Sequence, residues 1–374
     1  MAKPLPNHAD LVDYNYAVAG HDGTLCDVDG ELFIKPCTQA EIAFYDSSVA
    51  DHPDFAEFMP TYMGTLTLNE HPNGTTIEQA GAALLAKYPT AEHYEHHNGT
   101  FIENATTYER NEEALDRAEA VMIAKHASES AAPVKPSKRI VTNQAVVLEN
   151  ASHGFVRPNI LDVKLGVRLW ADDAAEEKRI RFNKLTAETT HKDLGFRIAG
   201  MRVWQGDGAT GKDIDKEGYK IYDKNYGRVS VQSSNIEEAF RNFLFAPGAG
   251  VDDELGKLVA QVLLADVKRI QTVLENQESR MFSASLLFVY EGDGAALRTA
   301  MEEASHPSTT RSPRTLVNQA EDNEDEDEVL GPKIYTVNVI DFAHAEWTPG
   351  RGPDENSLTG VRSVARILER VASA

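Results

Sequence analysis

Strand-like and helix-like segments follow one another in an irregular order along this chain of 374 residues. Short apolar runs of the length typical of buried strands are interspersed with longer stretches in which apolar residues recur at the spacing of a helix. This irregular mixture favours the α+β class. With 41% hydrophobic residues, the chain is apolar enough for one large packed domain or two lobes.

Local patterns predict the individual elements. Residues 16–19 and 31–36 carry short apolar runs on either side of turn residues, which predicts a β-hairpin and then a strand that Pro36 ends. Thr38 and Glu41 have the spacing of a capping box, which predicts a helix through residue 45. Further strands are predicted at 144–149, 196–204, 220–222, 285–290 and 335–342, and helices at 112–125, 234–245, 252–278 and 357–371.

Two polar stretches, at about 92–138 and 306–329, interrupt these elements. Within the second, residues 321–328 read EDNEDEDE, and a block with seven acidic residues in eight cannot bury itself. We expect a disordered acidic loop that serves solubility, in preference to a patch that binds a partner.

A crossing between two lobes is predicted directly after the buried run at 144–149, where the chain passes into Asn-Ala-Ser-His-Gly. The N-terminal lobe would then cover residues 1–149 and include the first polar stretch. The C-terminal lobe would cover residues 150–374 and include the acidic loop.

The formal net charge of -22 argues against binding to nucleic acid or anionic lipid, because the long-range field of the chain repels polyanions. A polyanionic substrate would therefore need a local basic pocket. Only Cys26 and Cys37 occur, which argues against a disulfide framework. The N-terminus lacks the pattern of a secretory leader, and no apolar run could span a bilayer. We therefore expect a protein of the nucleus and cytoplasm without stable membrane association.

An acid and a lysine stand two residues apart in the segment RPNILDVKLG, residues 157–166. In an extended strand this spacing places Asp162 and Lys164 on the same side, so that both could face one cleft. Phosphoryl transfer uses such a pair, a carboxylate to hold a hydroxyl and a cation to offset phosphate charge. A surface salt bridge would show the same pattern, so the pair alone does not decide between the two.

Four other positions have both a chemical and a structural interpretation. Asp341, at the end of an apolar strand, could bind magnesium or cap a turn, and His344 could contact a substrate phosphate or complete that turn. Lys35 could clamp ATP phosphates or lie as an ordinary surface lysine. Glu41 could pair with Lys35, although its capping position is a sufficient structural reason, which we favour slightly.

The densest basic cluster in this acidic chain lies at residues 177–184. On a helix, Lys178, Arg181 and Lys184 recur every third residue and share a broad face, which could hold a ligand with several phosphates. Neighbouring acidic residues could instead neutralise a solvated face without any ligand. The charge pattern leaves both interpretations open.

The segment at 157–166 matches the pattern P-x-x-x-D-x-K-x-G through Pro158, Asp162, Lys164 and Gly166. With this motif the chain resembles the inositol polyphosphate kinase family, and within it the fungal multikinase type. Ala284 is a departure, because it stands where family members carry the first of two serines. Supporting matches, spread along nearly the whole chain but absent from the two polar stretches, lie at 19–21, 35–36, 58–64, 194–201, 223–228, 285–292 and 340–344.

The resemblance implies a two-lobed, protein-kinase-like fold with an ATP cleft between the lobes. It implies that Lys35 contacts ATP phosphates and that Glu149 and Ala151 offer backbone groups to adenine. Asp341 would bind Mg2+, with Ser285 in the metal shell. Asp162, Lys164 and Asp341 would be the catalytic residues, and Asp162 would bind either the ribose or the acceptor hydroxyl. The residues expected to hold inositol phosphates, several of them on helices at about 172–195, are Lys164, Lys178, Arg181, Lys184 and His344.

The activity implied by the resemblance is ATP-dependent phosphorylation of inositol trisphosphate and tetrakisphosphate toward inositol pentakisphosphate, by a monomer. One alternative is an inositol hexakisphosphate kinase. Another, from a different class, is an interaction protein that joins transcription-regulatory proteins through the acidic loop. Lys35, Asp162, Lys164 and Asp341 together favour an enzyme, because a pure scaffold has no need of that combination.

Overall fold

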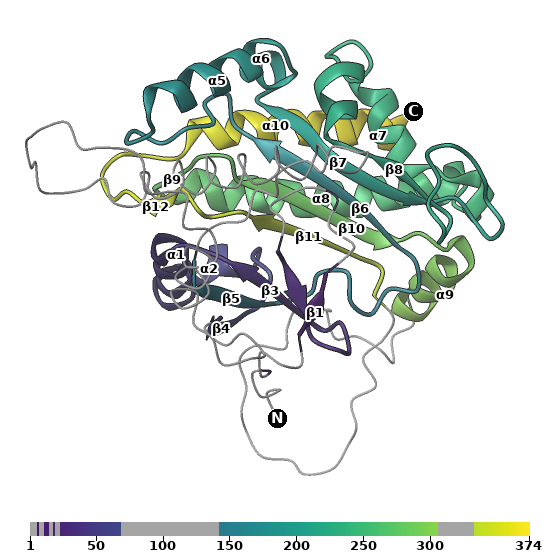
Figure 1. Cartoon of the computed structure of the whole chain (residues 1–374). Coiled ribbons are helices and arrows are strands. Elements are labelled where there is room, and N and C mark those ends of the chain that lie inside the picture. Colours follow the sequence, from purple (N-terminus) through teal and green to yellow (C-terminus); the bar gives the residue numbers. More distant parts are fainter. Residues whose placement is uncertain (1–5, 7–10, 15–17, 19–22, 69–141, 306–332) are drawn as a thin grey trace, which may run out of the picture.

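The computed structural model describes residues 6, 11–14, 18, 23–68, 142–305 and 333–374 (Figure 1). The N-terminal part of these forms an antiparallel sheet in the order β1-β2-β3-β5-β4. Central strands β3 and β5 bury Ile34 and Val147 on one face, so Lys35, next to Ile34, lies on the other face. The strands are β1 (Val12–Asp13), β2 (Leu25–Cys26), β3 (Leu32–Pro36), β4 (Tyr62–Thr67) and β5 (Gln144–Glu149).

Two helices, α1 (Gln39–Asp51) and α2 (Pro53–Ala56), follow β3. The Thr38 hydroxyl accepts a hydrogen bond from the Glu41 amide over 3.3 Å, so the predicted cap is confirmed. The helix extends beyond residue 45, because its later turns still bury side chains such as Ser48. Pro53, at the first position of α2, starts the second helix in a new direction.

The C-terminal part forms a second antiparallel sheet, in the order β11-β10-β6-β7-β8. Two long helices, α8 (Asp253–Asn276) and α10 (Glu355–Ser373), pack against each other and cover this sheet together with α7 (Ile236–Leu244) (Figure 1). The strands are β6 (Pro158–Leu165), β7 (Phe196–Trp204), β8 (Tyr219–Tyr222), β10 (Ser285–Glu291) and β11 (Tyr335–Ile340).

Shorter elements complete the described chain. Helices α5 (Glu176–Ala187) and α6 (His191–Leu194) follow β6 and lie above the second sheet in Figure 1. A two-stranded sheet pairs β9 (Ser279–Met281) with β12 (Ala345–Trp347). The remaining elements are η3 (Tyr226–Ser230), η4 (Pro247–Ala249) and α9 (Gly294–Ser305). Among the residues described, no helix has the length and apolar character needed to cross a membrane.

One hydrophobic core extends from the first sheet to the second, including Val146 of β5 and Leu161 of β6. Phe44 of α1 stacks on Trp347 of β12, with 5.1 Å between the ring centroids. The Val339 amide of β11 donates a hydrogen bond to the carbonyl of residue 58, after α2, over 2.7 Å. The two sheets are therefore packed as one body, and the segment between β5 and β6 crosses from one to the other.

Two antiparallel sheets with helices beside them confirm the α+β class. The strands predicted at 144–149 and 196–204 have those bounds, and the other predicted strands and helices after residue 144 agree within two residues. Elements that were not predicted include β1, β2, α2, β4, α9 and the pair of β9 and β12. The helix predicted at 112–125, part of the hairpin at 16–19, and most of both polar stretches lie outside the described residues. The lobe boundary at residue 149 stays a prediction.

Candidate active site

The register of the second sheet brings distant residues together at one point. Ser285 of β10 pairs with Lys164 of β6 on one side and with Ile340 of β11 on the other. Asp341 directly follows Ile340, so it comes to lie beside Lys164 although 177 positions separate them in the chain. Lys35 reaches the same point from β3 in the first sheet.

Asp341 is contacted by two lysines. Lys35 Nζ donates to Asp341 Oδ1 over 2.9 Å, and Lys164 Nζ donates to Oδ2 over 3.0 Å. The φ angle of Asp341 is 69°, in the left-handed region where residues other than glycine are uncommon and often functional. Burial alone would raise the pKa of Asp341, but the charges of Lys35 and Lys164 hold this pKa well below its usual value. The carboxylate is therefore ionised at physiological pH.

Lys35 is held from two sides. Its ammonium also donates to Glu41 Oε1 over 2.7 Å, and the Phe342 amide donates to that oxygen over 3.2 Å. Burial opposes the charge on Lys35, but Asp341 and Glu41 raise its pKa well above the usual value. Lys35 therefore stays an ammonium. Glu41 is fully buried. Its side chain takes part in this ion pair, whereas only its backbone amide takes part in the cap.

Asp162 is only 4% exposed, and its Oδ1 atom has no hydrogen-bond partner among the described residues. Burial raises the pKa of Asp162 and the charge of Asp341 adds to this rise, whereas Lys164, Ser285 and Arg197 lower it. A buried oxygen without a partner costs about 1–3 kcal/mol. Asp162 Oδ1 is therefore a hydrogen-bond acceptor left without a donor in the described part of this structure.

Lys164 uses all three of its N–H donors within the protein. Besides Asp341, its ammonium donates to the Ser283 carbonyl over 2.8 Å and to the Ser285 hydroxyl over 3.1 Å. Ser285 is fully buried, so in this arrangement its hydroxyl supports Lys164. A phosphate placed next to Lys164 would share or replace one of these contacts.

No group of three or more His, Cys, Asp or Glu side chains in the described part of the chain could hold a metal ion. Asp341 nevertheless offers an ionised carboxylate, and its side chain is 26% exposed. Hard divalent cations accept such an oxygen together with phosphate oxygens and water. A divalent cation at Asp341 would therefore take most of its ligands from a bound nucleotide, and the donor set fits that arrangement.

The two residues expected to offer backbone groups to adenine lie where the chain crosses between the sheets. Glu149 ends β5, and Ala151 lies in the turn that follows. The Glu149 carboxylate accepts hydrogen bonds from Lys333 Nζ over 2.9 Å and from the Thr61 hydroxyl over 2.8 Å. Burial opposes the negative charge, but Lys333 and Thr61 lower the pKa of Glu149. Because this side chain is engaged, a base bound here would meet backbone groups, and that role stays a prediction.

Helix α5 carries the basic cluster, but only one of its cations reaches the site. Lys178 Nζ lies 3.1 Å from Nε2 of His344, which follows Asp341 by three positions. Arg181 and Lys184 are exposed further along α5, where Lys184 lies 3.9 Å from Glu188. These two would contact only a ligand that extends along the helix.

Gly166 and His191 form a contact that the sequence did not reveal. The φ angle of Gly166 is 98°, and a Cβ there would lie 2.6 Å from Asn356 Nδ2, so glycine is required. His191 Nδ1 donates to the Gly166 carbonyl over 2.7 Å, and burial lowers the pKa of His191 to about 3. A backbone acceptor 25 positions away leaves no sequence signal, so His191 could not have been found by pattern.

Comparison with known proteins adds independent evidence. A model of the family described as inositol polyphosphate kinase matches residues 145–369. The chain is 31% identical to the inositol polyphosphate multikinase of Saccharomyces cerevisiae, an alignment that covers 94% of this chain and 96% of that protein. It is 29% identical to human inositol hexakisphosphate kinase 1, over 60% of this chain and 52% of that protein.

A solved structure is also similar. It is that of the inositol phosphate multikinase Ipk2 from Saccharomyces cerevisiae, in complex with ADP and Mn2+. The match has a TM-score of 0.58 and 26% identity, and it covers 91% of this chain and 99% of that one. The likeness therefore extends over most of the chain.

Proposed function

This chain belongs to the inositol polyphosphate kinase family, and on that premise we propose that it is an ATP-dependent inositol polyphosphate multikinase. Its substrates would be inositol trisphosphate and tetrakisphosphate, phosphorylated toward inositol pentakisphosphate. The observation that carries the proposal is the convergence of Lys35 and Lys164 on Asp341 from two sheets. The similarity to a multikinase along nearly the whole chain, against 60% for a hexakisphosphate kinase, favours the multikinase.

The nucleotide would be bound by residues that are ionised before it arrives. Lys35, kept charged by Asp341 and Glu41, would contact ATP phosphates. Asp341 would hold Mg2+, and Ser285 would be a second ligand only if Lys164 released its hydroxyl. The bound cation would offset the charge on the phosphates. Backbone groups at Glu149 and Ala151 would meet the adenine.

The inositol phosphate that accepts the phosphoryl group would be bound by Asp162, Lys164 and residues of α5. Asp162 Oδ1 would accept a hydrogen bond from the ribose or from the acceptor hydroxyl. Lys164 would stabilise negative charge on the phosphate being transferred. Lys178 and His344 would bind a ring phosphate, and Arg181 and Lys184 would bind phosphates that extend along α5.

Purified protein incubated with ATP, Mg2+ and single inositol phosphates tests the proposal. Chromatography should resolve inositol pentakisphosphate made from the tris- and tetrakisphosphates. Absence of that product would contradict the multikinase function. A pyrophosphate formed from inositol hexakisphosphate alone would establish the alternative kinase.

An interaction with transcription-regulatory proteins in the nucleus is a second candidate, supported only by the acidic residues 321–328, which lie outside the described residues. Deletion of residues 321–328 should remove partner binding and leave turnover unchanged if the loop is a docking segment. A change in solubility alone would contradict that role.

A further inference from the structure

Helix α5, which carries Lys178, is held in an unusual way. None of its twelve residues is buried, and Ile180 in its middle is 60% exposed. A helix of this length is only marginally stable alone in water. Burial of an apolar face therefore does not explain why α5 keeps its place, and other contacts must hold it.

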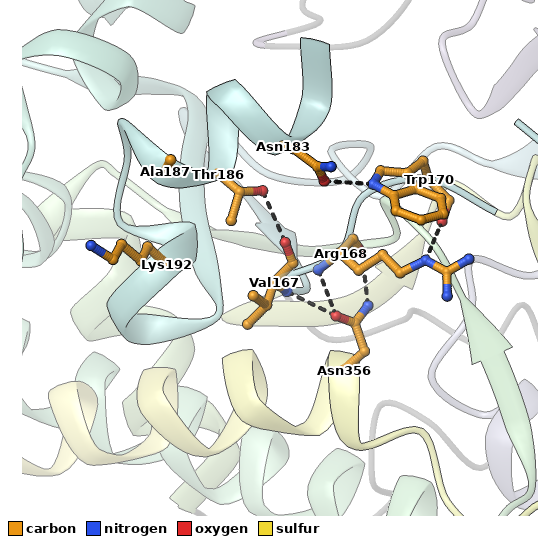
Figure 2. A pocket seen from close by; sticks show the side chains of 8 residues that line it. All are labelled: Val167, Arg168, Trp170, Asn183, Thr186, Ala187, Lys192 and Asn356. Carbon is orange, nitrogen blue, oxygen red and sulfur yellow. Dashed lines mark hydrogen bonds between the residues drawn. The ribbon is translucent and has the colours of Figure 1, made fainter. Parts of the chain in front are cut away.

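Those contacts gather around one tryptophan. The guanidinium carbon of Arg168 lies over the Trp170 ring at 3.9 Å from its centroid, and that of Arg179 lies over it at 4.9 Å. Trp170 Nε1 donates to Asn183 Oδ1 over 2.8 Å (Figure 2). Arg179 and Asn183 stand one turn apart on α5, so they fix both its position and its rotation. We call Arg168, Trp170, Arg179 and Asn183 the Trp170 clasp.

The base of the Trp170 clasp is bound to the start of α10. Asn356, in the first turn of α10, accepts hydrogen bonds from the amides of Val167 and Arg168 over 2.9 and 2.8 Å (Figure 2). Its Nδ2 donates to the Arg168 carbonyl over 2.9 Å. The Thr186 hydroxyl near the end of α5 donates to the Val167 carbonyl over 2.9 Å.

An open surface pocket lies beside α5. It has a volume of about 360 Å³ and is lined by Val167, Trp170, Ala187, Lys192 and residues next to them, including Arg168 and Asn183 of the Trp170 clasp (Figure 2). The helix could therefore move toward or away from this loop if its polar contacts were lost.

Lys178 is the residue next to Arg179, and it lies 3.1 Å from His344 near the proposed metal ligand. From these contacts we propose that Trp170 is a positioning residue for the acceptor substrate. By fixing α5, it keeps Lys178 beside His344, so that one ring phosphate meets both side chains. This inference rests on the proposed kinase function and assigns no contact between Trp170 and the substrate.

The test is steady-state kinetics of Trp170→Ala and Trp170→Phe with an inositol trisphosphate and ATP. Loss of the ring contacts and the hydrogen bond in Trp170→Ala should raise KM for the inositol phosphate about tenfold. The kcat and the KM for ATP should stay within about twofold, because the nucleotide contacts do not involve α5. Trp170→Phe keeps a ring for the two arginines, so its KM should rise only about threefold.

Ile180→Ala, a change on the exposed side of the same helix, is the matched control and should leave both KM values unchanged. Equal increases in the two KM values after Trp170→Ala would overturn the inference, because they would indicate general damage to the fold. An unchanged KM for the inositol phosphate would overturn it as well.

Hydrogen exchange separates this inference from the proposed function. Backbone amides of residues 176–187 should exchange faster in Trp170→Ala than in the wild type, while those of α8 and α10 should not. Unchanged exchange in α5 would overturn the role of the Trp170 clasp. If the wild type phosphorylates no inositol phosphate, the proposed function fails, and the exchange result still decides whether Trp170 holds α5.

Discussion

Asp162 and Asp341 lie at the same site, but their pKa values are shifted in opposite directions. The pKa of Asp162 is raised above its usual value, chiefly by burial, whereas two lysines lower the pKa of Asp341 against the effect of burial. A raised carboxyl pKa means that the folded state disfavours the charge, and a lowered one means that it favours the charge. The same replacement by asparagine should therefore change stability in opposite directions at the two positions.

Asp341→Asn should lower both activity and stability. Without the carboxylate, Lys35 and Lys164 face each other without an anion between them, and the proposed metal ligand is lost. We expect kcat to fall by at least about 100-fold. The unfolding temperature should fall by about 2–5 °C, a partial loss because the site is not fully closed to solvent. Calorimetry and turnover assays, with exposed Asp207→Asn as the matched control, measure these effects, and near-normal turnover would remove Asp341 from the mechanism.

Asp162→Asn should lower activity but raise stability at neutral pH. The pKa of Asp162 is higher in the folded state than in the unfolded state, so the folded state binds this proton more readily. The free energy of unfolding therefore falls as the pH rises from the usual pKa of aspartate through the pKa of Asp162 in the folded state. The asparagine variant avoids this loss and should unfold about 1–3 °C higher at pH 7. The gain should vanish below the usual pKa of aspartate, where both states of the wild type are protonated. Thermal unfolding at pH 7 and at pH 3 tests this, and a variant less stable at pH 7 would contradict it.

Among the elements, α5 is the one whose role in binding can be separated from its role in the fold. Its cations Lys178 and Arg181 lie outside the core, so their loss should alter ligand affinity without unfolding the protein. By contrast, Lys164 lies in the buried strand β6, and Asp341 directly follows the buried strand β11.

Lys178→Ala combined with Arg181→Ala should raise KM for an inositol phosphate about tenfold and KM for ATP less than twofold. The physical reason is the loss of two cations on the acceptor side only. The matched control is Lys212→Ala with Lys216→Ala, which removes the same charge from exposed positions outside α5. Equal changes for both substrates would point to a structural helix.

Sequence reasoning found the elements better than it found the contacts between them. The strand at 196–204 is visible because most of its residues are apolar. Lys35 and Asp341, in contrast, are 306 positions apart, and only the family resemblance joined them. Trp170 was missed because a single aromatic residue in a polar segment carries no periodic signal. β4 was missed because its residues alternate between exposed and half-buried, without an apolar run.

At the scale of the whole molecule, the continuous core predicts that both sheets unfold together. Trp347 contributes strongly to this coupling, because its ring lies against Phe44 and stacks on His52 at 3.5 Å. Wild-type protein should show one calorimetric transition. Trp347→Ala should lower its midpoint by several degrees, since such a truncation costs about 3–5 kcal/mol, and should not split it. Two separate transitions in the wild type would contradict a shared core.

The left-handed backbone at residue 341 has a consequence for natural variation. Glycine and asparagine enter that conformation most readily besides aspartate, and neither has a negative charge. Replacement of Asp341 by glycine or asparagine would therefore keep the backbone conformation but remove the carboxylate. Replacement by glutamate would keep the negative charge but strain the turn. Orthologues should accordingly fall into two groups at this site, aspartate-bearing active enzymes and inactive pseudokinases, with few partly active forms between them.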